Sequence, residues 1–173
     1  MAANILIALG SNRRHGRHGS PAGVVAAAIE ALAVFGTIVG RSHIHITAPV
    51  GPGGRAYANA AVELSTNATL PDLLAMLKAT ETAFGRRGGR RWGARVLDLD
   101  ILGAGQAVLP SRFGWRTARR GLIVPHSRLA ERRFVLDSLV EIAPDWRHPM
   151  LGATARQLRA RLLRRKASAG ASP

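Results

Sequence analysis

The stretch "VLDLDIL", residues 96–102, alternates apolar side chains with two aspartates. Successive side chains of a β-strand point to opposite faces, and residues i and i+2 share a face at roughly 6 to 7 Å. The stretch therefore predicts a strand whose Leu97, Leu99 and Ile101 point into the core. Asp98 and Asp100 are then expected side by side on the other face.

Two carboxylates placed in this way repel each other unless a cation or an arginine lies between them. Magnesium typically takes one or two carboxylates together with phosphate oxygens and water. A solvated sheet face bridged to arginine is the alternative. The loop just before the strand, residues 86–95, holds five arginines interrupted by glycines, and this favours a metal–nucleotide site. Its glycines allow it to hinge over a phosphoryl-transfer site.

The rest of the chain predicts a β-α-β-β-α-β order followed by helices. A capping serine, Ser20, and a capping threonine, Thr69, mark the starts of two helices. The order matches a ferredoxin-like α+β fold, an antiparallel sheet with helices on one face and the other face left for a site, plus C-terminal helices. The expected strands are 4–9, 37–47, 60–65 and 96–102, the expected helices are 21–35, 70–84, 134–144 and 152–165, and 103–124 is expected to be irregular.

Length and composition predict one soluble domain over residues 1–165 and a disordered tail over 166–173. The chain has no cysteine, which excludes disulfides and thiolate metal sites. The first apolar run is too short to cross a membrane and lacks a basic leader, so we expect a cytoplasmic protein.

The net charge is +15, and only two of the 25 basic residues are lysines. Arginine suits phosphate oxygens, so anionic partners are expected. A high-GC codon bias would also give arginine in place of lysine, and composition alone leaves nucleotide and nucleic acid open as partners.

Several single residues are candidates for binding. Glu81 lies on an apolar helical stripe, where a carboxylate either pairs with an arginine or contacts a ligand. Tyr57 and Asn59 follow the loop "TAPVG" and could contact a heterocycle, although a structural turn explains them as well. His126 could donate to a phosphate or be structural. The P-loop, the dinucleotide-binding fingerprint and the aromatic RNA-recognition pattern are all missing from the sequence.

Taken together, six segments carry a resemblance to a known family. They are "ALGSN" (8–12), "TAPVG…Y-N-A" (47–60), "E…G-R" (81–86), "RWGARVLDLDIL" (91–102), "VPH…ER-R-F-VL" (124–136) and "EIAP" (141–144). In this order they resemble 6-hydroxymethyl-7,8-dihydropterin pyrophosphokinase of folate biosynthesis. The resemblance implies transfer of the intact β,γ-pyrophosphate of ATP to the hydroxymethyl oxygen of the pterin, with release of AMP.

The resemblance also implies roles for individual residues. Asp98 and Asp100 match the ligands of two magnesium ions, and Arg86 and Arg95 match catalytic arginines. The positions that match ATP contacts are Glu81, Trp92, Arg95, Ile101, His126 and Arg132. The positions that match pterin contacts are Thr47, Pro49, Val50, Tyr57, Asn59, Trp92 and Phe134.

Some positions depart from the family pattern. Lys78 stands where the family often has a glutamine that contacts ATP, and the basic segment 110–121 has no assigned role. The loop from Arg86 to Trp92 is one residue short, which leaves open whether Arg87, Arg90 or Arg91 supplies a second loop arginine. We expect a monomer that uses ATP, magnesium and a reduced pterin, with no nucleic-acid or membrane partner. A non-enzymatic nucleic-acid-binding module is the competing class.

Overall fold

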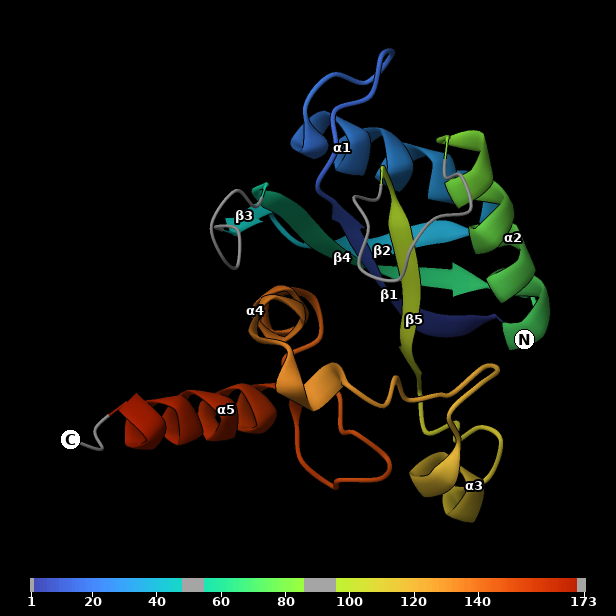
Figure 1. Cartoon of the computed structure of the whole chain (residues 1–173). Coiled ribbons are helices and arrows are strands. Elements are labelled where there is room, and N and C mark those ends of the chain that lie inside the picture. The colour runs from blue at the N-terminus through green and yellow to red at the C-terminus, as the bar shows by residue number, and fades with distance from the viewer. Residues whose placement is uncertain (1, 48–54, 86–95, 171–173) are drawn as a thin grey trace.

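The computed structural model describes residues 2–47, 55–85 and 96–170 (Figure 1). Five strands form one sheet, and helices pack on both of its faces. The strands are β1 (Ala3–Ser11), β2 (Thr37–Arg41), β3 (His45–Thr47), β4 (Tyr57–Thr66) and β5 (Asp98–Ala104). The helices are α1 (Pro21–Leu32), α2 (Leu70–Ala83), α3 (Arg112–Thr117), α4 (Arg133–Ile142) and α5 (Ala155–Gly170), with short 3-10 turns at Ala33–Phe35 and Leu129–Glu131.

The sheet is antiparallel, with strand order β2-β4-β1-β5 and β3 paired to β4 next to β2. This confirms the predicted α+β class and its antiparallel sheet. The central strand β1 pairs with β4 along its whole length and with β5 on its other side. Residues 47 to 63 positions away in β4 and 88 to 99 positions away in β5 are therefore held next to β1.

The two faces of the sheet bury two separate apolar clusters. Helices α1 and α2 cover one face, where Leu97, Leu99 and Ile101 are buried as predicted. Helices α4 and α5 lie on the opposite side in Figure 1, and their cluster includes Leu6 and Leu102. The second face is therefore not left bare, as the sequence suggested, but is covered over part of its area.

The predicted strand 37–47 is two strands, because Ser42 interrupts the pairing with β4. The Ser42 backbone N–H donates to the Ala61 carbonyl at 2.9 Å, while its hydroxyl accepts the Ala61 N–H at 2.9 Å. The same hydroxyl donates to the His43 carbonyl at 2.8 Å. A side chain replaces a backbone acceptor here, and a hydrophobicity pattern does not reveal such an exchange.

Both predicted caps of the first two helices are confirmed. Ser20 accepts the Gly23 N–H at 3.2 Å, with Pro21 in the first turn of α1. Thr69 accepts the Asp72 N–H at 3.3 Å and donates its own proton to the Asp72 carboxylate. These contacts satisfy N–H groups that have no partner inside the helix.

A bulge in β5 determines where the following segment returns to the sheet. Leu6 pairs with Gly103 and Ile7 pairs with Ile101, so Leu102 has no partner residue on β1. Its carbonyl accepts the His126 backbone N–H at 2.9 Å. The extra residue of a bulge leaves the ladder, and here its carbonyl holds the segment that carries His126 beside the sheet.

Two larger differences from the sequence predictions lie in the second half of the chain. The short helix α3, capped by Ser111, lies inside the stretch 103–124 that was expected to be irregular. Helix α5 continues to Gly170, so residues 166–170 of the expected tail are helical. Among the described residues, no helix combines the length and apolarity that crossing a membrane requires.

Stability at acid pH is expected to depend on His148, which is 1% exposed. Burial lowers the pKa of His148 to about 4 from an ordinary 6.5, and its Nδ1 accepts the N–H groups of Met150 and Leu151. Below pH 6.5 His148 binds a proton in the unfolded chain but stays neutral in the folded chain until the pH approaches 4. The free energy of unfolding should therefore fall, by about 3 kcal/mol from this group between pH 7 and pH 4.

Urea denaturation at stepped pH measures this loss for the wild type and for His148→Asn, whose amide oxygen can still accept. The variant should lose less free energy of unfolding over the same range. Equal pH slopes in the two proteins would contradict the assignment.

Candidate active site

Asp98 and Asp100 lie on β5, on the face that α4 partly covers. Their apolar neighbours in the strand are buried against α1 and α2, while both aspartates are half-buried. Asp98 pairs in register with Gly10 of β1, and Asp100 pairs with Ala8. The alternation predicted from the sequence is thus confirmed, and the two carboxylates stand beside two of the smallest residues of the sheet.

The side chains on the second face of β1 become smaller toward the end of the strand. Leu6 is buried under α4 and α5, whereas the next residues on that face are Ala8 and Gly10. On the other side of β1, Ala8 pairs with Ala61 and Gly10 pairs with Asn59. Directly opposite residues of an antiparallel pair share a face, so Asn59 and Asp98 flank a glycine on the same surface. A side chain at Gly10 would meet the Asn59 Oδ1 at 3.4 Å from its Cβ.

Asp100 is the centre of a charged group at this surface. An Arg132 guanidinium nitrogen lies 3.6 Å from its Oδ2, and the His126 Nε2 lies 4.0 Å from the same oxygen. Arg132 is the N-cap residue of α4, and His126 is held by the bulge of β5. Two segments that follow β5 in the sequence thus place a guanidinium group and an imidazole beside Asp100.

The surroundings of the His126 imidazole favour its neutral form. Burial lowers the pKa of His126, and the charges of Arg132 and Arg128 lower it further against the opposing effect of Asp100. Its Nδ1 accepts the Arg128 backbone N–H at 3.2 Å, so the proton of the neutral ring is on Nε2. The N–H therefore points toward the Asp100 side, where it can donate to an anionic oxygen.

Glu81 is buried beneath the strand that carries the aspartates. Its carboxylate accepts the Leu99 N–H at 2.7 Å and the Lys78 ammonium at 2.9 Å. Lys78 also donates to the Leu99 carbonyl at 3.3 Å. Of the two alternatives that the sequence left open, an ion pair is present, with a lysine in it. Leu99 lies between Asp98 and Asp100, so this pair fixes the backbone between the two carboxylates.

The predicted pterin contacts gather on β3 and β4. The Asn59 amide donates to the Thr47 hydroxyl at 3.1 Å, and Thr47 pairs in register with Tyr57. Tyr57 is 41% exposed. Phe134 of α4 packs at the edge of the second apolar cluster. These side chains share the face of Asp98 or come from the helix that covers that face.

The remaining predictions divide into two groups. Ile101 is 4% exposed and belongs to the core under α1 and α2. The others lie outside the described residues, so their sites remain predictions: Pro49, Val50, Arg86, Arg87, Arg90, Arg91, Trp92 and Arg95.

The donor atoms of the two aspartates have the chemistry of magnesium ligands. No group of three or more His, Asp or Glu that could hold a metal is present in the described part of the chain. Two neighbouring carboxylates fit magnesium, which fills its other positions with phosphate oxygens and water. The donor set suits a cation that binds together with a nucleotide.

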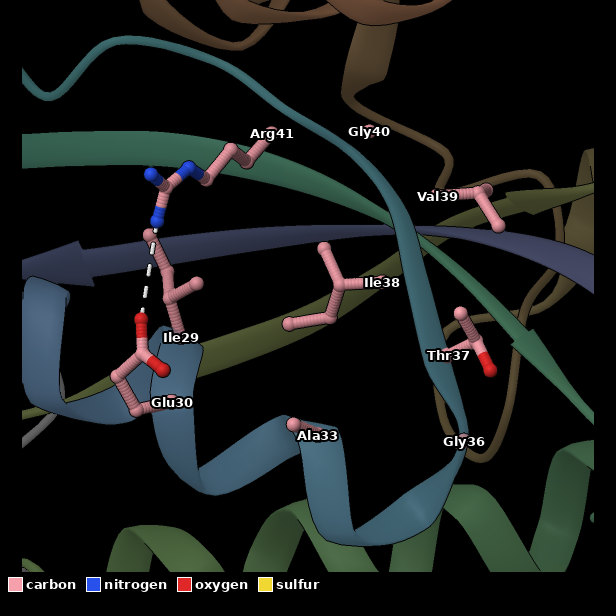
Figure 2. Close-up of a pocket in the computed structure, with 9 residues that line it drawn as sticks. All are labelled: Ile29, Glu30, Ala33, Gly36, Thr37, Ile38, Val39, Gly40 and Arg41. Carbon is pink, nitrogen blue, oxygen red and sulfur yellow. Dashed lines mark ion pairs between the residues drawn. The ribbon is translucent and has the colours of Figure 1, made fainter.

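A separate pocket of about 610 Å³ lies between the end of α1 and strand β2. Figure 2 shows Glu30 and Arg41 pointing toward one another across it, and they form an ion pair at 3.7 Å. None of its described lining residues is a predicted site residue. The pocket is therefore distinct from the aspartate site.

Comparison with protein families identifies the chain. The model of the family "7,8-dihydro-6-hydroxymethylpterin-pyrophosphokinase (HPPK)" matches residues 6–144. The chain belongs to this family. As an HPPK, it is a pyrophosphokinase of hydroxymethyldihydropterin in folate biosynthesis and an enzyme that uses ATP, as the sequence predicted.

Bacterial relatives named 2-amino-4-hydroxy-6-hydroxymethyldihydropteridine pyrophosphokinase resemble this HPPK over most of its length. The Pseudomonas aeruginosa protein is 36% identical over 152 residues, which are 86% of this chain and 86% of the relative. The Methylorubrum extorquens protein is 38% identical over 142 residues, 80% of this chain and 82% of the relative. A Synechocystis relative is 42% identical over 108 residues, and the match spans 62% of this chain and about half, 51%, of the relative.

Solved structures of Plasmodium falciparum HPPK-DHPS share the fold of this HPPK. The wild-type structure superposes with a TM-score of 0.73 at 14% identity, covering 98% of this chain and 46% of that chain. The wild-type structure with pteroate gives 0.73 at 14% identity, covering 97% and 44%. This chain thus spans less than half of those proteins, and at this identity the likeness concerns the fold alone.

A carboxylate that the sequence did not single out, Glu141, ties α4 to β3. Glu141 accepts the His43 backbone N–H at 2.8 Å and lies 3.0 Å from the His43 Nδ1 and 2.5 Å from the His45 Nε2. Burial raises the pKa of Glu141, but the hydrogen bonds from His43 and His45 outweigh that effect and lower it. His45 pairs with Asn59, so the contact braces the strand that carries Thr47. The alternating histidines of 43–47 and the "EIAP" segment were the available signals.

Removing this carboxylate is expected to loosen β3. In Glu141→Ala, amide hydrogen exchange over residues 43–47 should become about tenfold faster, because two hydrogen-bonded side chains and one backbone N–H lose their acceptor. Exchange in β1 should not change. The matched control is Glu131→Ala, which removes an exposed carboxylate whose one ion pair among the described residues is with Arg128 at 3.5 Å. Unchanged exchange at 43–47 in Glu141→Ala would contradict the bracing role.

Proposed function

We propose that this HPPK transfers the β,γ-pyrophosphate of ATP to the hydroxymethyl oxygen of 6-hydroxymethyl-7,8-dihydropterin at the face of the sheet that carries Asp98, Gly10 and Asn59. The observation that carries the proposal is the register across β1. It sets a carboxylate on one side of a glycine and an amide on the other. A phosphate group at Asp98 and a heterocycle at Asn59 can then bind next to each other, because the residue between them has no side chain.

Asp98 and Asp100 are the proposed ligands of magnesium, present as two ions when both substrates are bound. Bound magnesium would neutralise phosphate charge and polarise the phosphorus that is attacked. The two carboxylates hold their places because Glu81 and Lys78 bind the backbone of the residue between them. The chain contributes mainly positioning and charge, which is what phosphoryl transfer requires.

Arg132 and His126 are proposed as phosphate contacts. Arg132 already lies beside Asp100, and its guanidinium fork can bind a phosphate oxygen while it neutralises the carboxylate. The neutral His126 offers its Nε2 proton without adding a charge. By resemblance to the family, Arg86 and Arg95 supply further charge, Trp92 closes the site, and Glu81 and Ile101 border the adenosine.

Asn59, Thr47, Tyr57 and Phe134 are proposed to hold the pterin, together with Pro49 and Val50. The Asn59 amide is oriented by its hydrogen bond to Thr47, which leaves its carbonyl oxygen on the side of Gly10. An amide fixed in this way can bind the polar edge of a planar heterocycle. Tyr57 and Phe134 offer aromatic faces for stacking.

The direct test is to incubate the protein with ATP, magnesium and 6-hydroxymethyl-7,8-dihydropterin and to separate the nucleotides. AMP should form in a one-to-one ratio with the pterin diphosphate. Formation of ADP, or no turnover together with tight oligonucleotide binding, would favour the nucleic-acid-binding class instead. A monomer, which we expect, should elute near its mass of 18.4 kDa in size-exclusion chromatography with light scattering.

Replacing either aspartate should abolish most of the turnover. Asp98→Ala and Asp100→Ala are each expected to lower kcat by about a hundredfold or more, because the magnesium ions lose a ligand in the step they assist. The matched control is Asp145→Ala, which removes an exposed carboxylate that lies 3.9 Å from Arg156. Circular dichroism and thermal melting establish that all three variants fold. Near-normal turnover in both site variants would falsify the metal role.

A further inference from the structure

A second set of cations lies at the same end of the sheet as Asp98. A pocket of about 590 Å³ opens there, and three of its described lining residues are arginines: Arg13, Arg14 and Arg55. The other described lining residues are Asn12, Pro21 and Ala56. None of these residues has a place in the transfer reaction proposed above.

The pairing of β1 with β4 explains why these arginines converge. Arg13 and Arg14 follow the end of β1 at Ser11, and Arg55 comes just before the start of β4 at Tyr57. Ser11 pairs with Ala58, so the end of one strand and the start of the other are neighbours. The convergence is built into the antiparallel register, although about forty residues separate the two segments.

The charge at this pocket is not compensated within the described part of the chain. Some arginines of the described chain pair with acids, as Arg132 does with Asp100 and Arg159 does with Asp137, whereas others on its surface do not. No ion pair joins Arg13, Arg14 or Arg55 to a carboxylate among the described residues, and no Asp or Glu lines the pocket there. All three arginines are exposed, so a ligand can reach them from solvent.

Neighbouring guanidinium groups repel one another, and an anion between them removes this cost. The planar fork of arginine matches the oxygens of phosphate, and several forks around one pocket can bind a group with more than one negative charge. Pro21 and Ala56 line the pocket with apolar surface, and neither has a side chain that could accept a hydrogen bond from the arginines. A phosphoryl anion fits this combination of charges better than a neutral or cationic ligand does.

We propose that Arg13, Arg14 and Arg55 form a binding site for a phosphoryl anion, separate from the magnesium-binding aspartates and from Arg132. Its ligand class is a phosphate or pyrophosphate group, free or carried by a small molecule. The site binds its anion by charge-assisted hydrogen bonds from the guanidinium groups and needs no metal ion. It requires none of the groups of the transfer reaction.

Binding of inorganic pyrophosphate to the full chain tests this site. Titration calorimetry is carried out in EDTA without magnesium, so that the aspartates cannot hold the anion through a metal. The wild type should bind pyrophosphate, and the triple variant Arg13→Gln, Arg14→Gln, Arg55→Gln should bind it at least tenfold more weakly. The control Arg161→Gln, Arg164→Gln, Arg165→Gln removes the same charge from exposed positions of α5 and should keep the wild-type affinity.

A third variant, Arg116→Gln, removes one exposed arginine of α3 that has no proposed contact, and it should also keep the wild-type affinity. The proposal is overturned if the wild type does not bind pyrophosphate, if the triple variant binds as the wild type does, or if either control weakens binding as much as the triple variant. The measurement does not involve AMP formation. A protein that binds pyrophosphate through these arginines but makes no AMP would refute the proposed function and leave this site standing.

Discussion

The pairing of β1 with β4 on one side and with β5 on the other is the constraint on which the rest of the molecule depends. It is antiparallel on both sides, so residues of three strands that are far apart in the sequence form rows across the sheet. One row joins Asp98, Gly10 and Asn59, and the next joins Asp100, Ala8 and Ala61. A shift of register by one residue would turn every aspartate and amide of these rows to the opposite face.

The change in side-chain size along the second face of β1 then divides that face into two parts. Leu6 lies in an apolar cluster under α4 and α5, and burial of this cluster holds the C-terminal helices against the sheet. Ala8 and Gly10 follow toward the strand end, where the polar side chains gather. The same strand thus binds a helix layer at one end and leaves room for substrates at the other. Arg132 reaches Asp100 because α4 is anchored there, and His126 reaches it because the bulge of β5 holds its backbone.

Local patterns predicted much of this architecture. The alternation of residues 96–102, the caps Ser20 and Thr69 and the apolar helical stripes each depend on interactions within a few residues, which a sequence displays directly. The prediction was wrong at Ser42, where a hydroxyl takes the place of a backbone acceptor and divides one expected strand into two. It also missed α3 inside the basic stretch 103–124 and the helical extension of α5 over 166–170. Short helices and helix ends carry little periodic signal.

By itself, the sequence determined the fold class, the placement of the two carboxylates on one face, and the family to which the chain belongs. The period of a strand and the order of motifs are local properties that the sequence shows directly. Only the tertiary structure decided the partners: Lys78 for Glu81, Glu141 for His43 and His45, and the meeting of Arg13 and Arg14 with Arg55. These contacts join segments through register and helix packing. No local pattern specifies which charged group a distant strand or helix will bring into reach.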